Sequence, residues 1–378
     1  MRSRWLMMPL LLSLLTGALH AAGPQLVAAP QRDLWPDSLG SNAGFDRASR
    51  AELLVFAPAL AESESMDAAT LMTRLKIKQV DEASVARLRK QWWQRLLLNY
   101  QAASAACVSS EPFCLPVHDL DGFRKAAVGF TAPAEARYAS WYDNALTFHR
   151  TYLDELLRLA ALFPRTNSEV DVFSPREITG SDWPDRHFQL SFDDGPTAIG
   201  GGTDRLVTML REHQLHALFF VLGERLQPRL QAAGRDAMAQ TYKGMCVGAH
   251  GWEHKSHSGW PQWQDSVIRS TALIQAQLPE VQSPWFRPPF GQRRADSAAF
   301  FQAQGLRVAL WNIDSQDWNS KVDADQVRQR VLTLMLLWRR GVILFHDIHD
   351  KAQQAVPWLL QQTHDAGVVW TDCHDLDG

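Results

Sequence analysis

Two adjacent carboxylates follow one of the most strand-like stretches of this chain. Residues 187–192 (HFQLSF) alternate and are apolar enough for a buried strand, and Asp193 and Asp194 come directly after it. Gly195 and Pro196 then interrupt the pattern, as in a turn. Two acidic side chains held this close repel each other unless a cation or a shared proton neutralises them. The stretch is therefore either a solvated turn or part of a site that handles a cation or protons.

The same arrangement, a strand followed by polar or charged residues, recurs four times downstream. These strand ends carry His250 and His254, then Arg287, then Asp314 and Asp317, and finally His346. Parallel strands of a barrel present their carboxyl ends on one face, which is where the active sites of such barrels lie. His250 and His254 are four residues apart, close enough to share a metal ion if the segment turns helically.

Strand and helix patterns alternate throughout the second half of the chain. Such alternation predicts parallel strands with helices packed outside them. Periodicity alone does not separate a barrel from an open, doubly wound sheet. We expect strands near 187–192, 215–222, 245–249, 284–287, 307–313, 341–346 and 368–371, and helices near 203–213, 224–241, 262–278, 294–304, 323–339 and 352–366.

Five motifs in this half resemble those of the NodB-homology polysaccharide deacetylases, which form carbohydrate esterase family 4. The motifs are FDDG (192–195), HGWEH (250–254), RPPFG (287–291), DSQDW (314–318) and LFH (344–346). The resemblance covers roughly residues 185–373, about half of the chain. It implies an α/β fold, a distorted (β/α)7-type barrel, preceded here by an all-α region.

The resemblance also implies a divalent metal held by Asp194, His250 and His254. Nitrogen and oxygen ligands suit Zn²⁺, and Co²⁺ or Ni²⁺ would also fit. Asp193 is implied to be the general base that takes a proton from the attacking water. Arg287 is implied to keep that carboxylate ionised and oriented, because its guanidinium is planar and permanently charged.

At the other strand ends, the resemblance implies that His346 is the general acid. Asp317 is its implied carboxylate partner, and Asp314 is the alternative, because the motif has two aspartates and the sequence does not choose between them. Phe290 and Trp318 are predicted to line the substrate groove, since flat aromatic faces stack on sugar rings.

One position departs from the family pattern in a way that bears on the metal site. Gly251 stands where the family usually carries Ser or Thr, whose hydroxyl would steady the loop. The change removes no ligand, but it predicts a looser metal site.

The first half of the chain predicts export followed by a helical region. A basic start and about 15 apolar residues, too few for a typical membrane span, precede Ala21 and Ala22. An uncleaved membrane anchor is the alternative to a signal peptide. Apolar residues recur at helical spacing from Val85 to Leu96 and from Tyr138 to Phe163. The predicted division is a signal peptide over 1–22, a helical accessory domain over 23–164, a linker over 165–186 and the catalytic domain over 187–378.

Net charge and cysteine content limit the partners and the cellular compartment that we expect for this protein. A formal net charge of −3 gives no reason to expect nucleic acid or an anionic membrane surface as a partner. Four cysteines in an exported chain predict disulfides, and Cys107 with Cys114 is the favoured pair. The pairing of Cys246 and Cys373 stays open at this point.

The N-terminal segment predicts a periplasmic or secreted protein, and the resemblance implies a metal-dependent hydrolase that removes acetyl groups from a polysaccharide. An N-acetylglucosamine-containing polymer is the expected substrate. One alternative is an O-acetyl esterase, for example one that acts on acetylated xylan. The other is a non-catalytic glycan-binding protein with a weakened barrel, in which the helical region does the work. The sequence assigns no task to that region.

Overall fold

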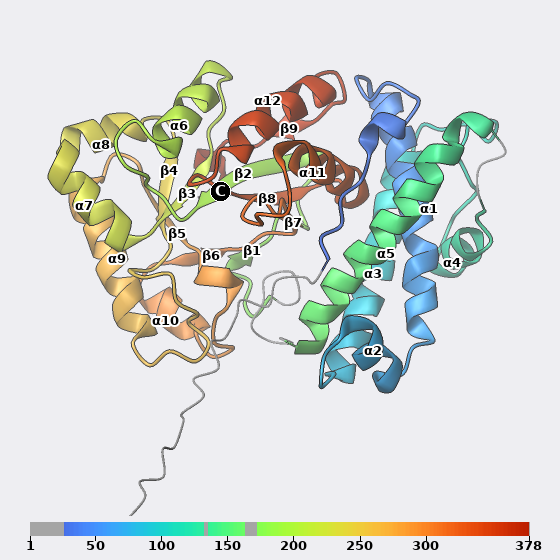
Figure 1. Ribbon diagram of the computed structural model, residues 1–378, viewed down its shortest axis with the longest axis horizontal. Coiled ribbons are helices and arrows are strands. Elements are labelled where there is room, and N and C mark those ends of the chain that lie inside the picture. Colours follow the sequence, from blue (N-terminus) through green and yellow to red (C-terminus); the bar gives the residue numbers. More distant parts are fainter. Residues whose placement is uncertain (1–25, 132–134, 163–171, 378) are drawn as a thin grey trace, which may run out of the picture.

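A computed structural model describes residues 26–131, 135–162 and 172–377 of the chain. The predicted signal peptide, residues 1–22, lies outside the described residues. Among the helices that are described, none is long and apolar enough to cross a membrane. Figure 1 shows a bundle of N-terminal helices beside a sheet that is surrounded by the helices of the second half.

The strands of the described chain all belong to one parallel sheet. They are β1 (Glu177–Ile178), β2 (His187–Asp193), β3 (Leu218–Val221), β4 (Cys246–Ala249), β5 (Gln282–Phe286), β6 (Arg307–Ala309), β7 (Ile313–Asp314), β8 (Gly341–His346) and β9 (Val369–Trp370). The order across the sheet is β1-β6-β5-β4-β3-β2-β8-β7, and β9 pairs with β2 off this path. In the β2–β8 register, Asp193 lies directly opposite His346.

The sheet curls until its two edges almost meet. Strands β6 and β7 lie near opposite ends of the strand order, yet only residues 310–312 separate them in the chain. Such a short connection spans no more than about 14 Å. Just after β1, the carbonyl of Thr179 accepts a hydrogen bond of 3.0 Å from the backbone N–H of Val342 in β8. The predicted distorted barrel is confirmed, whereas the single strand predicted over 307–313 is wrong, because these residues supply a strand to each edge.

Alternation along the central strand separates the barrel interior from the helical layer. In β2, Phe188, Leu190 and Phe192 belong to the apolar core that the helices cover. Ser191 and Asp193 alternate with them and therefore point into the barrel. The surrounding helices are α6 (Gly202–Glu212), α7 (Gly223–Ala233), α8 (Arg235–Thr241), α9 (Trp263–Gln277), α10 (Ala298–Ala303), α11 (Ala324–Trp338) and α12 (Lys351–Thr363).

Side-chain caps define the starts of four N-terminal helices. Ser41, Asp67, Asp81 and Asp119 each accept a hydrogen bond from the backbone N–H three residues further on. Asp81 thus caps the helix that the sequence predicts there. The helices are α1 (Asn42–Glu64), α2 (Ala68–Leu75), α3 (Glu82–Ser104), α4 (Leu120–Val128) and α5 (Ala139–Leu162).

This helical region packs directly on α11 of the barrel. Ser49 Oγ donates to the carbonyl of Leu336 at 2.7 Å, and Asn99 Nδ2 donates to that of Leu337 at 2.9 Å. A single apolar core runs through both regions. The segment predicted to be a linker, 165–186, includes β1, so it contributes to the sheet. The domain boundaries themselves remain a prediction.

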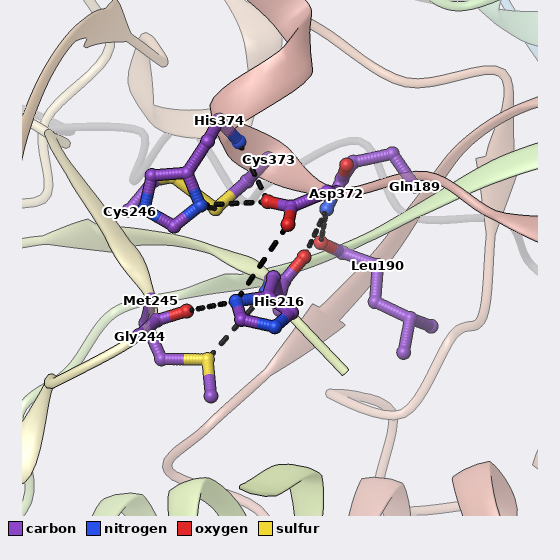
Figure 2. Close-up of a disulfide and its surroundings, with 10 residues drawn as sticks. Gln189, Leu190, His216, Gly244, Met245, Cys246, Asp372, Cys373 and His374 are labelled. Carbon is purple, nitrogen blue, oxygen red and sulfur yellow. Dashed lines mark hydrogen bonds and ion pairs between the residues drawn. A yellow bond between two sulfur atoms is a disulfide. The ribbon is translucent and has the colours of Figure 1, made fainter. Parts of the chain in front are cut away.

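Two disulfides join the four cysteines. Cys107–Cys114 closes a short loop in the helical region, as predicted. Cys246–Cys373, which the sequence left open, ties the start of β4 to the C-terminal segment after β9 (Figure 2). This second bond lies at the N-terminal end of β4, opposite the end that precedes His250.

We expect the two disulfides to differ in their contribution to stability. Loop-closure entropy predicts a loss of about 5 kcal/mol for Cys246→Ser/Cys373→Ser and about 2 kcal/mol for Cys107→Ser/Cys114→Ser. The reason is that they close sequence separations of 127 and 7 residues. Urea denaturation of both double variants measures this difference. Equal losses would contradict the expectation.

Candidate active site

The carboxylate of Asp193 lies inside the barrel against a buried guanidinium. Arg287, directly after β5, donates from Nη1 to Asp193 Oδ1 at 2.8 Å, and both side chains are almost fully buried. Asp193 Oδ2 lies 3.7 Å from His250 Nε2. One oxygen of this carboxylate is therefore engaged by arginine, while the other faces the histidine.

The remaining donors of Arg287 reach across the barrel. Nε and Nη2 donate to the carbonyls of Ala309 and Leu310, at 2.9 and 3.1 Å. Nη1 also donates to Ser191 Oγ at 2.9 Å. These contacts satisfy the guanidinium, as a buried charge requires, and fix its plane. They bring Asp193 and Arg287 together, as the predicted roles require.

Asp194, His250 and His254 form a group of ligand type. Asp194 Oδ1 lies 3.5 Å from the Nε2 atom of each histidine, and one ligand atom from each residue lies within 4.8 Å of the others. His250 Nδ1 donates to the carbonyl of Arg287 at 2.7 Å, which leaves the lone pair on Nε2, the atom that faces the carboxylate.

The electrostatics of this group suit a cation. Asp194 Oδ1 is buried and has no hydrogen-bond partner among the described residues. Burial lowers the pKa of His254 to about 4, so its imidazole is neutral near pH 7 and free to ligate. Burial works to raise the pKa of Asp194, but the neighbouring imidazoles of His250 and His346 favour its charged carboxylate and lower that pKa. The donor set therefore fits a divalent metal such as Zn²⁺.

Gly251 is held in a conformation that its missing side chain permits. Its φ is +89°, and a Cβ there would lie 3.1 Å from Ser266 Oγ and 3.3 Å from His257 Nε2. Ser266 in α9 instead accepts a hydrogen bond of 2.7 Å from the backbone N–H of Trp252. The carbonyl of Gly251 accepts one of 3.0 Å from Gly223. The loop therefore has its own supports, which the sequence did not reveal.

At the end of β8, His346 is paired with Asp317. The imidazole donates from Nδ1 to Asp317 Oδ1 at 2.7 Å, and the backbone N–H of His346 donates to Oδ2 at 2.8 Å. Asp314, the alternative partner, instead accepts from the backbone and side chain of Gln316 at 2.8 and 3.0 Å. Burial opposes the charged imidazole, but the charge and hydrogen bond of Asp317 prevail and raise the pKa of His346 to about 10.

The two predicted groove residues differ in their surroundings. Phe290 has a φ of +60°, is 37% exposed, and its ring lies 4.3 Å from that of His254 in a T-shaped arrangement. Trp318 is half-buried and follows Asp317 directly. Phe290 is therefore placed beside the ligand group, whereas Trp318 is the neighbour of Asp317 in the chain.

Asp347 is a buried acid for which the sequence suggested no role. Thr203 Oγ1 donates to its Oδ2 at 2.8 Å, and its backbone N–H donates to the carbonyl of Asp193 at 3.2 Å. Burial raises the pKa of Asp347 to about 7. A Cβ on Gly195 would overlap this carboxylate, so glycine is needed there for packing. Its position directly after His346 was the only sequence signal.

A second group with metal-ligand chemistry lies near the Cys246–Cys373 bond. His216, Asp372 and His374 gather there (Figure 2). His216 Nδ1 donates to the carbonyl of Gly244 at 2.7 Å, and His374 Nδ1 contacts Asp372 at 2.6 Å. The Nδ1 atoms of both histidines already have partners, and the three residues are partly or fully exposed. This group differs in both respects from the buried, unpaired Asp194 oxygen.

Comparison with known proteins identifies the family of this chain. The profile of the polysaccharide deacetylase family matches residues 180–309. A chitooligosaccharide deacetylase of Rhizobium leguminosarum bv. trifolii is 30% identical over 176 residues, which make up 46% of this chain and 76% of that protein. The chain belongs to the polysaccharide deacetylase family. The barrel described above is thus its polysaccharide deacetylase, or NodB-homology, region.

Two further relatives illustrate the range of this deacetylase family. A peptidoglycan-N-acetylglucosamine deacetylase of Bacillus cereus is 27% identical over 230 residues, covering 59% of this chain and 80% of that protein. A bifunctional xylanase/xylan deacetylase of Cellvibrio japonicus is 34% identical over 136 residues. These are 34% of this chain but only 19% of that much longer protein.

The His346–Asp317 pair should make stability depend on pH. The folded-state pKa of His346, about 10, lies above the usual value near 6.5 in the unfolded chain. The stabilisation is therefore complete below about pH 6.5 and is lost as pH rises toward 10. In metal-free protein, we expect the difference in unfolding free energy between wild type and His346→Gln to shrink by up to about 1.4 kcal/mol per pH unit over this range. Urea denaturation measures it, and a pH-independent difference would contradict the assignment.

Replacing Gly251 by serine, the residue type usual in the family, should weaken the site. We expect a loss of about 1–2 kcal/mol from the left-handed backbone, together with weaker zinc binding because Ser266 and His257 must move. Gly200→Ser is the matched control, since Gly200 has a φ of +73° but nothing within 4 Å of a Cβ. Tighter zinc binding by Gly251→Ser would overturn this interpretation.

Proposed function

We propose that this polysaccharide deacetylase is a metal-dependent hydrolase that removes N-acetyl groups from an N-acetylglucosamine-containing polymer. The observation that carries the proposal is the meeting of three groups at the carboxyl ends of the strands. These are the Asp193–Arg287 pair, the ligand group of Asp194, His250 and His254, and the His346–Asp317 pair. A base, a metal site and an acid are the parts that amide hydrolysis needs.

Asp193 is the proposed general base. Arg287 occupies its Oδ1, so Oδ2 is the atom that receives a proton from the attacking water. The guanidinium stabilises the charged carboxylate and prevents it from rotating, because its other donors are bonded to the barrel wall. Water attacks the acetyl carbonyl as this proton moves to Asp193.

His346 is the proposed general acid. Its Nδ1 is bonded to Asp317, so Nε2 is the atom that gives a proton to the departing amine nitrogen. The raised pKa of His346 means that the imidazole carries this proton near neutral pH. The C–N bond then breaks, and the products are acetate and a free amino group on the sugar.

Asp194, His250 and His254 are the residues that would hold the metal, with Zn²⁺ preferred and Co²⁺ or Ni²⁺ as alternatives. When bound, such an ion supplies Lewis-acid polarisation and a lowered pKa for water. Phe290 and Trp318 are proposed to form an apolar wall for the sugar rings, which suits the exposed ring of Phe290.

A second candidate function is O-acetyl ester hydrolysis. The similarity to the xylanase/xylan deacetylase favours it, and an alkoxide leaving group would also use the proton of His346. A non-catalytic, glycan-binding role loses its main support, because the loop at Gly251 has hydrogen bonds of its own.

We also propose that the enzyme acts in the periplasm or outside the cell on an acetylated polysaccharide. The two disulfides support an oxidising compartment, where such bonds persist. Membrane attachment would follow only from an uncleaved N-terminal segment.

The first experiment is acetate release from chito-oligosaccharides, peptidoglycan and acetylated xylan, with and without chelator and added zinc. We expect release that chelator abolishes and zinc restores, with N-acetyl substrates preferred. Release from xylan alone would favour the esterase. No release from any of these polymers would count against the proposal.

Removal of one ligand should abolish both zinc binding and activity. We expect Asp194→Asn and His250→Ala to bind no zinc tightly and to lose at least about a hundredfold in activity. His374→Ala is the matched control, because it removes a histidine from the other ligand-type group and should change neither property. Full activity of a metal-free Asp194→Asn variant would overturn the assignment.

A further inference from the structure

A buried ion pair joins the helical region to the barrel. Glu155 in α5 accepts from Arg330 in α11, with Oε2 to Nη2 at 2.7 Å and Oε1 to Nη1 at 3.2 Å. Both residues are buried. The backbone of Ala28, which precedes the first helix, contacts both members of the pair. Its N–H donates to Glu155 Oε1 at 2.7 Å, and its carbonyl accepts from Arg330 Nη1 at 2.9 Å.

The third nitrogen of Arg330 reaches the loop that carries the partner of the proposed acid. Arg330 Nε donates to the carbonyl of Asp314 at 2.9 Å. Its positive charge also favours the ionised carboxylate of Asp314, whose pKa is raised by burial. Glu155 binds Nη1 and Nη2 of Arg330 and so orients the guanidinium. The position of Arg330 Nε therefore depends on the helical region.

The turn from Asp314 to Asp317 is short, buried and strained. Gln316 has a φ of +60°, which non-glycine residues rarely adopt. The turn is held by Asp314 accepting from the Gln316 N–H at 2.8 Å and by Ser315 Oγ accepting from the Asp317 N–H at 3.2 Å. Asp317 at its end uses both carboxylate oxygens on His346. A shift of the turn therefore changes how His346 is held.

An interface role alone does not account for this ion pair. Apolar packing and the neutral hydrogen bonds of Ser49 and Asn99 already join the two regions. Burying a charged pair costs desolvation free energy that well-packed apolar residues would avoid. The pair also fixes the orientation of the Arg330 guanidinium, so that Nε donates to the backbone carbonyl of Asp314.

We infer that Glu155 is a positioning residue, by which the helical region fixes, through Arg330, the turn that presents Asp317 to His346. This gives the accessory helices a task in the reaction. The inference rests on the proposed function, in which His346 protonates the departing amine.

Comparing substrates with different leaving groups distinguishes a positioning role of Glu155 from a purely structural one. An amide needs an acid to protonate its departing nitrogen, whereas 4-nitrophenyl acetate releases a stable phenolate without one. In Glu155→Gln, we expect kcat for N-acetyl chito-oligosaccharides to fall about tenfold or more, with KM and zinc content unchanged and 4-nitrophenyl acetate turnover nearly constant. His346→Gln should show the same selective loss of amide hydrolysis. Its fall in kcat is the largest that Glu155→Gln can cause through His346.

The neighbouring residue on the same helix supplies the control. Asp154 pairs with Arg74 at 2.8 Å, and both lie in the helical region away from the barrel. Asp154→Asn removes an ion pair without touching α11, so it should leave the amide-to-ester ratio unchanged. If Glu155→Gln and Asp154→Asn changed the amide-to-ester ratio equally, the effect would be on stability alone, and the inference would be overturned.

A double variant keeps the test decisive if Glu155→Gln folds poorly. Glu155→Leu/Arg330→Met removes both members of the ion pair and should fold, because neither member is left as an unpaired charge. It also removes the contact to Asp314, so the amide-to-ester ratio should still fall. A folded double variant with the wild-type ratio would refute the inference. If the wild type releases no acetate from any amide, the proposed function fails first, and this outcome is distinguishable from the others.

Discussion

The buried pair of Arg287 and Asp193 depends on the curvature of the whole sheet. Arg287 follows β5 and Asp193 ends β2, and two strands separate them in the strand order. They meet only because the sheet curls, and Arg287 then also holds the backbone of residues 309–310 at the end of β6. A guanidinium without these partners would be an uncompensated charge in the interior. The curvature of the barrel therefore also determines the orientation of the Asp193 carboxylate.

The sequence predicts well what local pattern encodes. The carboxyl ends of β2, β4, β5 and β8 carry the expected residues, and the alternation in β2 separates Ser191 and Asp193 from the outer core. The helical spacing of the N-terminal region and the cap at Asp81 are also visible without a structure. Hydrophobic period and turn chemistry determine these features, and both are properties of short segments.

What the sequence does not predict depends on contacts between distant segments. The choice of Asp317 over Asp314 follows from the turn at Gln316, which no propensity signals. Residues 307–313 look like one strand, because nothing local shows that the sheet edges meet there. The loop at Gly251 is supported by Ser266 in a helix that begins twelve residues later. The contact between Arg330 and Glu155 joins residues 175 positions apart.

The disulfide at the start of β4 lies at the end of the barrel opposite to the proposed active site. Cys246 is fixed to the C-terminal segment at one end of a strand whose other end leads to His250. Loops at the end that carries the proposed active site can then accept substitutions without loosening the strands that carry them. Such an arrangement favours evolvability: new polymer specificities could arise by exchanging loops, while the covalently tied end keeps the scaffold intact.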